Sequence, residues 1–514
     1  MSFTSPEFFL FIALILPAYV IFKPRWRWAV LLAGSLVFYA ALGAPYLLAA
    51  LAAVTLASFF GGLWMGRVDA ERRKPYLWAG IFLNLAVLLV FRYLGDLAHF
   101  FDPASGALPV FISVGVSFYA FQGISYLADI YKKRIEPEPH LGHFALYMAF
   151  FPKILQGPIE RGANLLPQLK GDLTFSEPAA AAGLRRFGWG VFKKLVVADR
   201  LGLLVNPVFA NVHDYTGLSL LLAVYLFAFQ LYFDFSGYTD MALGLAGLFN
   251  IRLSENFDRP YLARTVTDFW RRWHMSFSHW IRDYIFMPLQ SAWRRWGGWR
   301  VVAALLVTFL ASGLWHGIAW TFVAWGLLFG IFMCLEWLYT PYRRRLYAWL
   351  HIEKSRLAGA WQVFVTFNLV CFAWIFFRAS TISDALYIAG NLFNGVNVLA
   401  CGKLAVKYGL YLPVFKGIVN PAAFSSAASQ VCTNTLANFP AFSSQFLGQN
   451  MAVLLVSAVI LALGGWIGKR LPAGRWPAGV RWAGYALFSF WVLYGLAILE
   501  APGQAYTQFL YFKF

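Results

Sequence analysis

The sequence predicts an all-α integral membrane protein that crosses the bilayer many times. Of its 514 residues, 60% are hydrophobic and only 13% are charged, whereas soluble domains carry about 25% charged residues. Unbroken apolar runs recur along the chain at lengths suited to helices that cross the hydrocarbon. The composition excludes a disordered chain and an ordinary cytosolic enzyme. The unbroken runs exclude an outer-membrane barrel, whose strands alternate in polarity.

The chain carries 42 Lys and Arg against 23 Asp and Glu, a formal net charge of +19. In a soluble domain such an excess would indicate nucleic-acid binding. In a membrane protein it is typical of cytoplasmic loops, which collect Lys and Arg. We therefore expect no nucleic-acid partner, and the basic residues serve to orient the chain.

The first five apolar runs are separated by gaps of which every second one is basic. The run 8–22 lacks the basic start and the cleavage site of a secretory signal, and basic residues follow it. The positive-inside rule therefore places the N-terminus outside. Basic residues lie after the first, third and fifth runs: Lys23, Arg25, Arg27, Arg67, Arg72, Arg73, Lys74, Lys132, Lys133 and Arg134.

Two segments in the middle of the chain, 151–158 and 233–238, place polar residues inside apolar sequence. Polar groups at membrane depth are tolerated only where protein buries them or where they line a wet cavity. We therefore expect a packed core with an internal site. For the first segment, a short loop between helices is an equal alternative. For the second it is disfavoured, because Asp234 has apolar neighbours.

Apolar runs reappear after residue 300, and basic clusters at 343–345 and 469–481 mark cytoplasmic gaps. The last helix then leaves the C-terminal tail outside. Cys334 and Cys371 lie in apolar runs and are expected to pack there. Cys401 and Cys432 bracket a stretch expected to be external, so whether they form a disulfide stays open. The apolar runs are 301–314, 320–338, 361–377, 451–468 and 482–499.

The segment from Asp268 to Asp283 has the pattern of one amphipathic helix at a membrane surface. At about 100° per residue its apolar side chains form one stripe. His274 falls at the edge of this stripe and faces inward more than His279. Spacing alone favours a structural histidine there. The stripe holds Val266, Phe269, Trp270, Trp273, Phe277, Trp280 and Tyr284, and the other side holds Arg271, Arg272, His279, Arg282 and Asp283.

His316 is a single ionisable residue between two apolar runs, flanked by Gly313 and Gly317. The glycines permit close approach of another backbone or of a ligand. A neutral imidazole at membrane depth can act as a general base at pH 7. A structural histidine bonded to a carbonyl of a neighbouring helix is the alternative. The sequence holds no catalytic-triad spacing, phosphate loop, CxxC or HExxH, so the residues alone leave an enzyme and a transporter open.

Two of these segments carry a family resemblance. FWRRWHMSFSHWIRDYIFMPL (269–289) and SGLWHG (312–317) resemble the signature segments of the membrane-bound O-acyltransferase (MBOAT) family. The AlgI-like branch, which acetylates bacterial polysaccharides, is similar over more of the chain, from the N-terminus to about residue 380 and again at the very end. Its further matching segments are SFYAFQGISYLADIY (117–131), FFPKILQGPIER (150–161), LYFDFSGYTDMALGLAGLF (231–249) and ENFDRPY (255–261).

The resemblance implies roughly ten to twelve transmembrane helices, with interfacial and re-entrant helices, around a central funnel. It implies that His316 is the catalytic histidine and His274 the second family histidine, which reverses the interpretation from spacing. After Pro288 this chain departs from the family pattern, which bears on the surface for the acyl donor or a partner. Residues expected to line or support the acyl path are Asp234, Ser236, Asn256, Arg271, Arg272, Arg282, Asp283 and Trp315.

The tail from Phe509 to Phe514 resembles an aromatic C-terminal motif of this branch, in which a tyrosine is implicated as an acyl relay. That implies a relay role for Tyr511. An aromatic tail anchored at the membrane interface is an equal alternative. We expect one membrane domain, 1–514, with N-terminal helices (1–135), a core with both histidine motifs (136–380), an external-side segment (381–450) and C-terminal helices with the tail (451–514).

The expected function is transfer of an acyl group, most simply acetyl, from a cytoplasmic thioester such as acetyl-CoA to an exported polysaccharide. The implied setting is a bacterial inner membrane with both termini periplasmic. We expect membrane lipids, a periplasmic SGNH-type acyltransferase and polysaccharide machinery as partners, and no metal or permanently bound cofactor. D-alanyl transfer, acylation of a lipid or protein, a glycan or donor transporter and an export scaffold remain alternatives.

Overall fold

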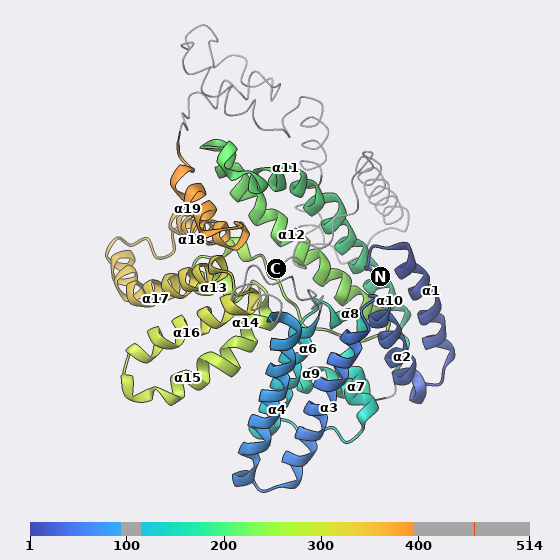
Figure 1. Ribbon diagram of the computed structural model, residues 1–514. Helices are drawn as coiled ribbons and strands as arrows, with labels where there is room; N and C mark the ends of the chain where they lie inside the picture. The colour runs from blue at the N-terminus through green and yellow to red at the C-terminus, as the bar shows by residue number, and fades with distance from the viewer. Residues whose placement is uncertain (94–114, 172, 395–456, 458–514) are drawn as a thin grey trace, which may run out of the picture.

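The computed structural model describes residues 1–93, 115–171, 173–394 and Ser457 (Figure 1). Every regular element in these residues is a helix, as predicted. Six helices there are long and apolar enough to cross a membrane: Tyr46–Arg67, Ala70–Phe91, Leu218–Leu248, Trp299–His316, Trp320–Trp349 and Arg356–Arg378. The predicted ten to twelve spans include segments outside the described residues, among them 451–468 and 482–499.

The N-terminal part matches the predicted apolar runs, with helices that begin and end close to the basic gaps. Helix α6 is the innermost of them, because all its residues from Val116 to Ile130 are buried. It packs against α3 and α4, which run beside it (Figure 1). An added Cβ at Gly123 would lie only 2.4 Å from Ser58 Oγ and 2.5 Å from Asn84 Oδ1, so a larger residue has no room there. The helices are α1 Pro6–Ile21, α2 Arg27–Ala40, α3 Pro45–Arg67, α4 Arg73–Leu88 and α6 Val116–Tyr131.

The middle of the chain forms the packed core that the sequence predicts. The segment 151–158 is buried. It begins with α8, which lasts one turn, and continues without regular helix. The segment 233–238 lies inside the continuous, centrally placed helix α12. Helix α10 lies against α12 through glycines such as Gly183 and Gly244, whose backbones touch. The helices are α7 Leu141–Ala149, α8 Phe151–Ile154, α9 Gly162–Lys170, α10 Glu177–Val191, α11 Asp199–Ala210 and α12 Leu218–Leu248.

The prediction of a single amphipathic helix over 268–283 is wrong. Helices α13 (Val266–Trp270) and α14 (Met275–Ile281) are separate, and His274 between them has a left-handed backbone with φ 43° and ψ 54°. Hydrogen bonds from outside the segment impose the break, because Asn256 binds the first N–H groups of α14 and Arg272 O accepts from Asp258 N. The apolar stripe does face inward as predicted: all its members are buried except Tyr284, which is half-buried.

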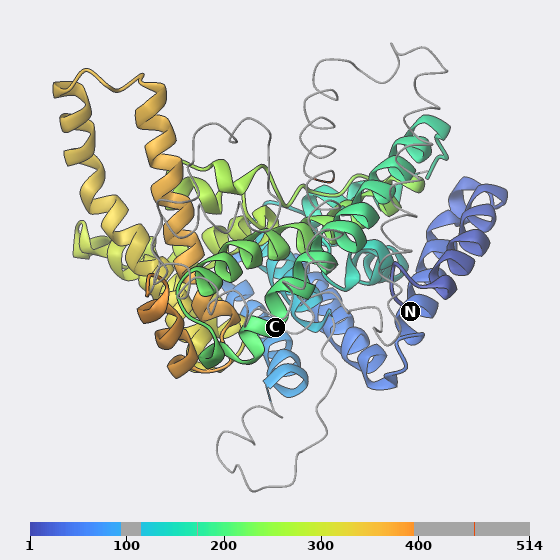
Figure 2. The same cartoon turned by 90° about the horizontal axis from the view of Figure 1, so that it is seen from above.

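The last described helices are α15 Met287–Ala292, α16 Trp299–His316, α17 Trp320–Trp349, α18 Arg356–Arg378 and α19 Ile382–Asn391. Helices α17 and α18 form a hairpin that projects from the body (Figure 2). The basic cluster 343–345, predicted as a gap, lies in the last turns of α17, since that helix continues beyond its apolar part. Cys334 and Cys371 are buried and free, as expected of packing residues. Cys401 and Cys432 lie outside the described residues.

Short 3-10 and π-helical segments connect these elements. The 3-10 segments are η1 Pro24–Trp26, η2 Ala70–Arg72, η5 Val212–Asp214, η6 Pro260–Leu262 and η8 Arg294–Trp296, and the π segments are η3 Leu89–Tyr93, η4 Phe192–Ala198 and η7 Arg282–Phe286. Two π segments adjoin groups of interest, since η4 carries Lys194 and η7 continues α14. Such segments recur at functional sites.

Candidate active site

His316 is the last residue of α16, where the helix stops at Gly317. Its side chain is buried, with the residue 6% exposed. The imidazole meets the rings of Phe377 and Trp325 nearly edge to face, at centroid distances of 4.9 and 5.0 Å. Trp315, the preceding residue, lies 4.6 Å away. An ionisable ring is thus held among aromatic side chains from α16, α17 and α18.

The glycines beside His316 do what the sequence predicts, which is to let another backbone approach. A Cβ on Gly313 would collide with the carbonyl oxygen of Phe322, and the Cα of Gly326 is 3.4 Å from that position. A Cβ on Gly317 would lie 2.9 Å from the Phe322 ring. Helices α16 and α17 therefore pack at close range directly beside the histidine.

His274 lies in the break between α13 and α14 and is 2% exposed. Its ring contacts Phe235 of α12 at 4.7 Å and Phe277 of α14 at 5.1 Å. Burial lowers the pKa of His274 to about 3, so the ring is neutral at physiological pH. A left-handed backbone in a residue other than glycine costs free energy and is a feature of functional sites.

Trp315 joins the two histidines. Its ring centroid lies 6.1 Å from that of His274 and 4.6 Å from that of His316. The indole is held by stacking on Phe277 at 4.4 Å and by contact with Phe121 at 5.7 Å. The two signature segments, far apart in sequence, therefore meet at one buried aromatic side chain.

Asn256 connects to this centre through the start of α14. The residue is fully buried at 0% exposure. Its Oδ1 accepts from the N–H of Ser276 at 3.1 Å, and its backbone carbonyl accepts from the N–H of Met275 at 2.9 Å. These are the two residues that follow His274, so Asn256 sets where α14 begins.

Asp234 forms a buried ion pair with Lys194, whereas its neighbour Phe235 touches His274. Its Oδ1 accepts from Lys194 Nζ at 2.7 Å, and the same ammonium lies 2.8 Å from Asp199. This buried group ties η4 and α11 to α12. Ser236, two residues further along α12, is buried too. Asp234 is thus placed to brace the core.

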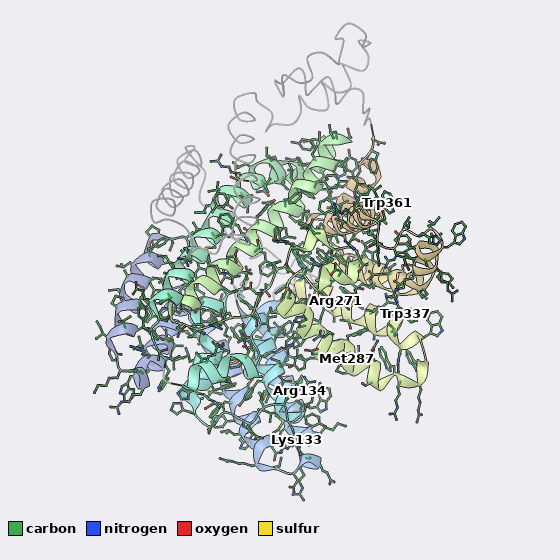
Figure 3. The ribbon with its side chains drawn as sticks, turned by 180° about the vertical axis from the view of Figure 1, so that it is seen from behind. Lys133, Arg134, Arg271, Met287, Trp337 and Trp361 are labelled. Atoms are coloured by element: carbon green, nitrogen blue, oxygen red, sulfur yellow. The ribbon has the colours of Figure 1, made fainter. Side chains whose placement is uncertain are left out.

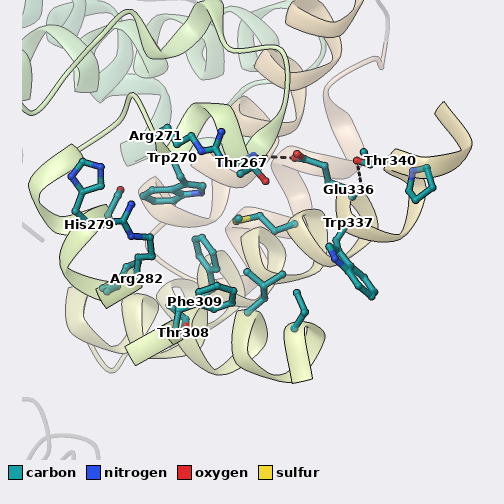
Figure 4. A pocket seen from close by; sticks show the side chains of 17 residues that line it. Thr267, Trp270, Arg271, His279, Arg282, Thr308, Phe309, Glu336, Trp337 and Thr340 are labelled. Carbon is teal, nitrogen blue, oxygen red and sulfur yellow. Dashed lines mark hydrogen bonds between the residues drawn. The ribbon is translucent and has the colours of Figure 1, made fainter. Parts of the chain in front are cut away.

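A cavity of about 530 Å³ lies between the segment α13–η7, α16 and α17 (Figure 4). Most of its lining is apolar. Arg271, His279 and Arg282 line the side of the α13–η7 segment, and Glu336 and Thr340 line the side of α17 (Figure 4). Arg271 of the α13–η7 segment and Trp337 of α17 both line the cavity and are exposed (Figure 3). Glu336 closes the cavity on the α17 side and accepts the N–H of Thr267 at 3.0 Å. The cationic side chains that line it are those of Arg271 and Arg282.

Aromatic rings separate the cavity from His316. Trp270 lines the cavity, and its ring lies 6.0 Å from that of Trp325. Trp325 in turn lies 5.0 Å from His316. Two indoles therefore stand between a cavity large enough for a ligand arm and the buried imidazole.

Two other predicted residues lie outside both the cavity and the histidine centre. Arg272 binds Asp268 of its own segment, with Nε and Oδ1 2.9 Å apart. Asp283 binds Arg282 at 2.8 Å and lies 3.5 Å from Arg161, so it holds one cavity residue in place. Tyr511 lies outside the described residues.

Sequence reasoning missed Trp325, Phe377 and Glu336. Glu336 carried a usable signal, because it is the one acidic residue in the apolar run 320–338 and charged residues in such runs often serve function. The two aromatic residues carried none, since their apolar runs hold many aromatic residues that meet no histidine.

The arrangement supports acid–base chemistry on a buried substrate. A neutral imidazole can take a proton from a hydroxyl, and apolar surroundings keep water from competing. The cavity offers apolar length beside a cationic edge, which is the chemistry of an aliphatic arm that carries a phosphate.

Comparison with known proteins shows the family to which the chain is similar. The model of the membrane-bound O-acyltransferase family matches residues 132–382, which include both histidines. The chain is 30% identical to the "Probable alginate O-acetylase AlgI" of Pseudomonas aeruginosa over the whole length of both chains. It is 32% identical to the "Peptidoglycan O-acetyltransferase" of Helicobacter pylori, over 74% of this chain and 76% of that one. It is also 28% identical to the "Teichoic acid D-alanyltransferase" of Bacillus subtilis, over 51% of this chain and 68% of that one.

Proposed function

The chain belongs to the membrane-bound O-acyltransferase family and is a multi-pass membrane O-acyltransferase, and we propose that it supplies acetyl groups for the O-acetylation of an exported polysaccharide. The donor is a cytoplasmic acyl thioester, acetyl-CoA or an acylated carrier. Two of the relatives above are named for O-acetylation, one of alginate and one of peptidoglycan. The observation that carries the proposal is the buried imidazole of His316, which shares Trp315 with His274.

In the proposed reaction His316 removes the proton of an acceptor hydroxyl as its oxygen attacks the thioester carbonyl carbon. The carbonyl π pair moves onto oxygen and returns as the C–S bond breaks. The leaving thiolate takes the proton from the imidazolium, so the histidine is regenerated. A hydroxyl is a weak nucleophile at pH 7, and a positioned base contributes about 10²–10⁴-fold.

The donor arm enters through the cavity lined by Arg271 and Arg282. A phosphate on the arm pairs with these guanidinium groups, and the apolar walls take the aliphatic part. The thioester then reaches His316 when the indoles of Trp270 and Trp325 move aside. This route follows from the cationic edge of the cavity and from its aromatic separation from His316.

Acceptance of the acetyl group takes place on the opposite side of the membrane. Tyr511 serves as the relay hydroxyl, and a periplasmic SGNH-type acyltransferase then transfers acetyl to the polymer. The setting is a bacterial inner membrane with both termini periplasmic, as the distribution of basic residues suggests. No permanently bound cofactor is required, because the thioester is already activated.

D-alanyl transfer is the second candidate, because the chain is also similar to a protein named as a teichoic acid D-alanyltransferase. Mass analysis of the cell-surface polymer separates the two. By formula mass, each acetyl ester adds about 42 daltons to the polymer and each D-alanyl ester adds about 71 daltons. The mass that disappears when the chain is deleted therefore identifies the transferred group.

Replacement of His316 by Ala tests the proposed base. We expect the rate at which acetate appears on the polymer to fall by about 10²–10⁴-fold, because the hydroxyl loses its proton acceptor. The measurement is acetate released by alkali from polymer made by cells with equal amounts of membrane-inserted chain. His213→Ala is the control, since its side chain is 60% exposed and lies away from α16. Wild-type acetylation by a well-inserted His316→Ala chain would refute the base role.

A further inference from the structure

The side-chain amide of Asn256 has one atom, Nδ2, that forms no hydrogen bond to α14. Its Oδ1 and its backbone carbonyl both bind N–H groups of the first turn of α14. The bond from the Ser276 N–H also identifies which amide atom is the oxygen, since an N–H can donate only to Oδ1. The other atom, Nδ2, is a donor with two hydrogens.

This Nδ2 is buried and has no hydrogen-bond acceptor among the residues that the structure describes. Buried polar atoms without a partner are few in native proteins, and each calls for an explanation. Asn256 would cap α14 equally well through Oδ1 alone. The retained amide donor therefore points to a ligand group that accepts from it.

The amide is close to His274, whose ring meets that of Trp315, the neighbour of His316. In a planar amide the nitrogen lies about 2.2 Å from the oxygen, from standard bond lengths, so Nδ2 lies near the start of α14 as Oδ1 does. The next residue, Phe257, packs on Phe235 at 5.1 Å, and Phe235 packs on His274 at 4.7 Å. Asn256 thus belongs to the wall around His274.

Acyl transfer needs a donor at such a place. When the hydroxyl oxygen attacks, the carbonyl oxygen gains the electron pair of the C=O bond and becomes anionic until the C–S bond breaks. A fixed donor in a dry site stabilises that oxygen strongly. We propose that the side-chain amide of Asn256 donates a hydrogen bond to the acyl carbonyl oxygen of the thioester. This role rests on the proposed acyl-transfer function.

Asn256→Asp separates the proposed role from a merely structural one. Aspartate keeps the oxygen that caps α14, and it is as good a cap as asparagine, but its ionised form has no hydrogen to donate. We expect Asn256→Asp to lower the acetyl-transfer rate per folded chain by about 10²–10³-fold. Asn256→Ala should lower the rate at least as much and the unfolding temperature as well.

The pH response gives a second readout. When the carboxyl group introduced by Asn256→Asp is protonated, it carries an O–H donor, so the residual rate of this variant should rise relative to wild type as the pH is lowered. A role in packing alone gives no such recovery. Asn84→Asp is the matched control: Asn84 is equally buried, its Nδ2 donates to Ser58 and Gly80 O, and it lies on α4. We expect that change to lower stability and leave the rate per folded chain unchanged.

The experiment measures acetate on the polymer and the amount of detergent-extracted folded chain, with His316→Ala in the same series. A wild-type rate per folded chain in either Asn256→Asp or Asn256→Ala overturns the assignment. If His316→Ala is inactive in that case, the proposed function stands and only the role of Asn256 falls. If His316→Ala is fully active, the proposed function itself fails.

Discussion

At the scale of single residues, the backbone of His274 is the feature that sequence patterns could not supply. Helical spacing correctly predicted that its side chain faces inward. The same spacing also implied a helical backbone, whereas His274 has a φ of 43°. Bonds from Asn256, 18 positions earlier, cause the difference. The family resemblance pointed to the residue, while its conformation depends on contacts that only the folded chain brings together.

Burial of His274 makes stability depend on pH. The folded pKa is about 3, below the unfolded value of about 6.5, so between these values the unfolded state binds the extra proton. The free energy of unfolding therefore falls as the pH drops below about 6.5, by up to about 1.4 kcal/mol per pH unit. His274→Gln should flatten this dependence. Thermal unfolding in detergent between pH 4 and pH 8 measures it.

If the stability of His274→Gln varied with pH as the wild type does, titratable groups other than His274 would determine the pH dependence of unfolding. His279→Gln is the matched comparison. His279 is exposed, and burial and the charge of Arg282 lower its pKa while Asp283 opposes that shift. That variant should change the pH dependence less than His274→Gln does.

At the scale of helices, long apolar runs were predictable and their interruptions were not. Helices α1, α2, α16 and α18 follow their apolar runs closely, because such a run can satisfy its backbone in a membrane only as a helix. The break between α13 and α14 has no Gly or Pro to announce it. It arises from the tertiary contacts of Asn256 and Asp258.

The contact between α10 and α12 depends on glycine. A Cβ on Gly244 would lie 2.5 Å from Phe187 N and 2.6 Å from Gly183 O, and these are backbone atoms that cannot move alone. Gly244→Ala should cost about 1–3 kcal/mol of stability, as overpacking does. Gly390→Ala in α19 is the control, because nothing lies within 4 Å of its Cβ position. That change should be neutral or stabilising by up to about 1 kcal/mol.

Thermal unfolding of the two alanine variants, measured side by side, tests this packing. Equal unfolding temperatures for Gly244→Ala and the wild type would mean that α10 and α12 can separate without cost. A lower unfolding temperature for Gly390→Ala than for Gly244→Ala would contradict the close contact between α10 and α12.

At the scale of the whole molecule, α18 is long and apolar enough to cross the membrane. Its 23 residues span about 34 Å, at 1.5 Å per residue, which exceeds the roughly 30 Å of hydrocarbon. Basic residues collect before its first residue and at the end of α6, where Lys133 and Arg134 project (Figure 3). The proposed orientation places these groups, and the donor cavity, in the cytoplasm.

Labelling of single cysteines tests both the orientation and the donor route. In a chain without its native cysteines, Ser380→Cys should react with an impermeant maleimide in intact spheroplasts. Arg271→Cys, at the cavity, should react only after permeabilisation, and acetyl-CoA should slow that reaction. Both residues are exposed. Labelling of Arg271→Cys from outside would reverse the orientation, and equal labelling with and without acetyl-CoA would argue against the cavity as its entrance.

The indoles of Trp270 and Trp325 have a consequence for the cell as well as for the reaction. A membrane that stores energy as ion gradients cannot tolerate a pore held open from end to end. On the proposed route, the side chains packed edge to face around the imidazole would act as a seal and would open only as far as an incoming arm displaces them. The proposed transfer would then pass a small chemical group between compartments while protons and salts stay where they are.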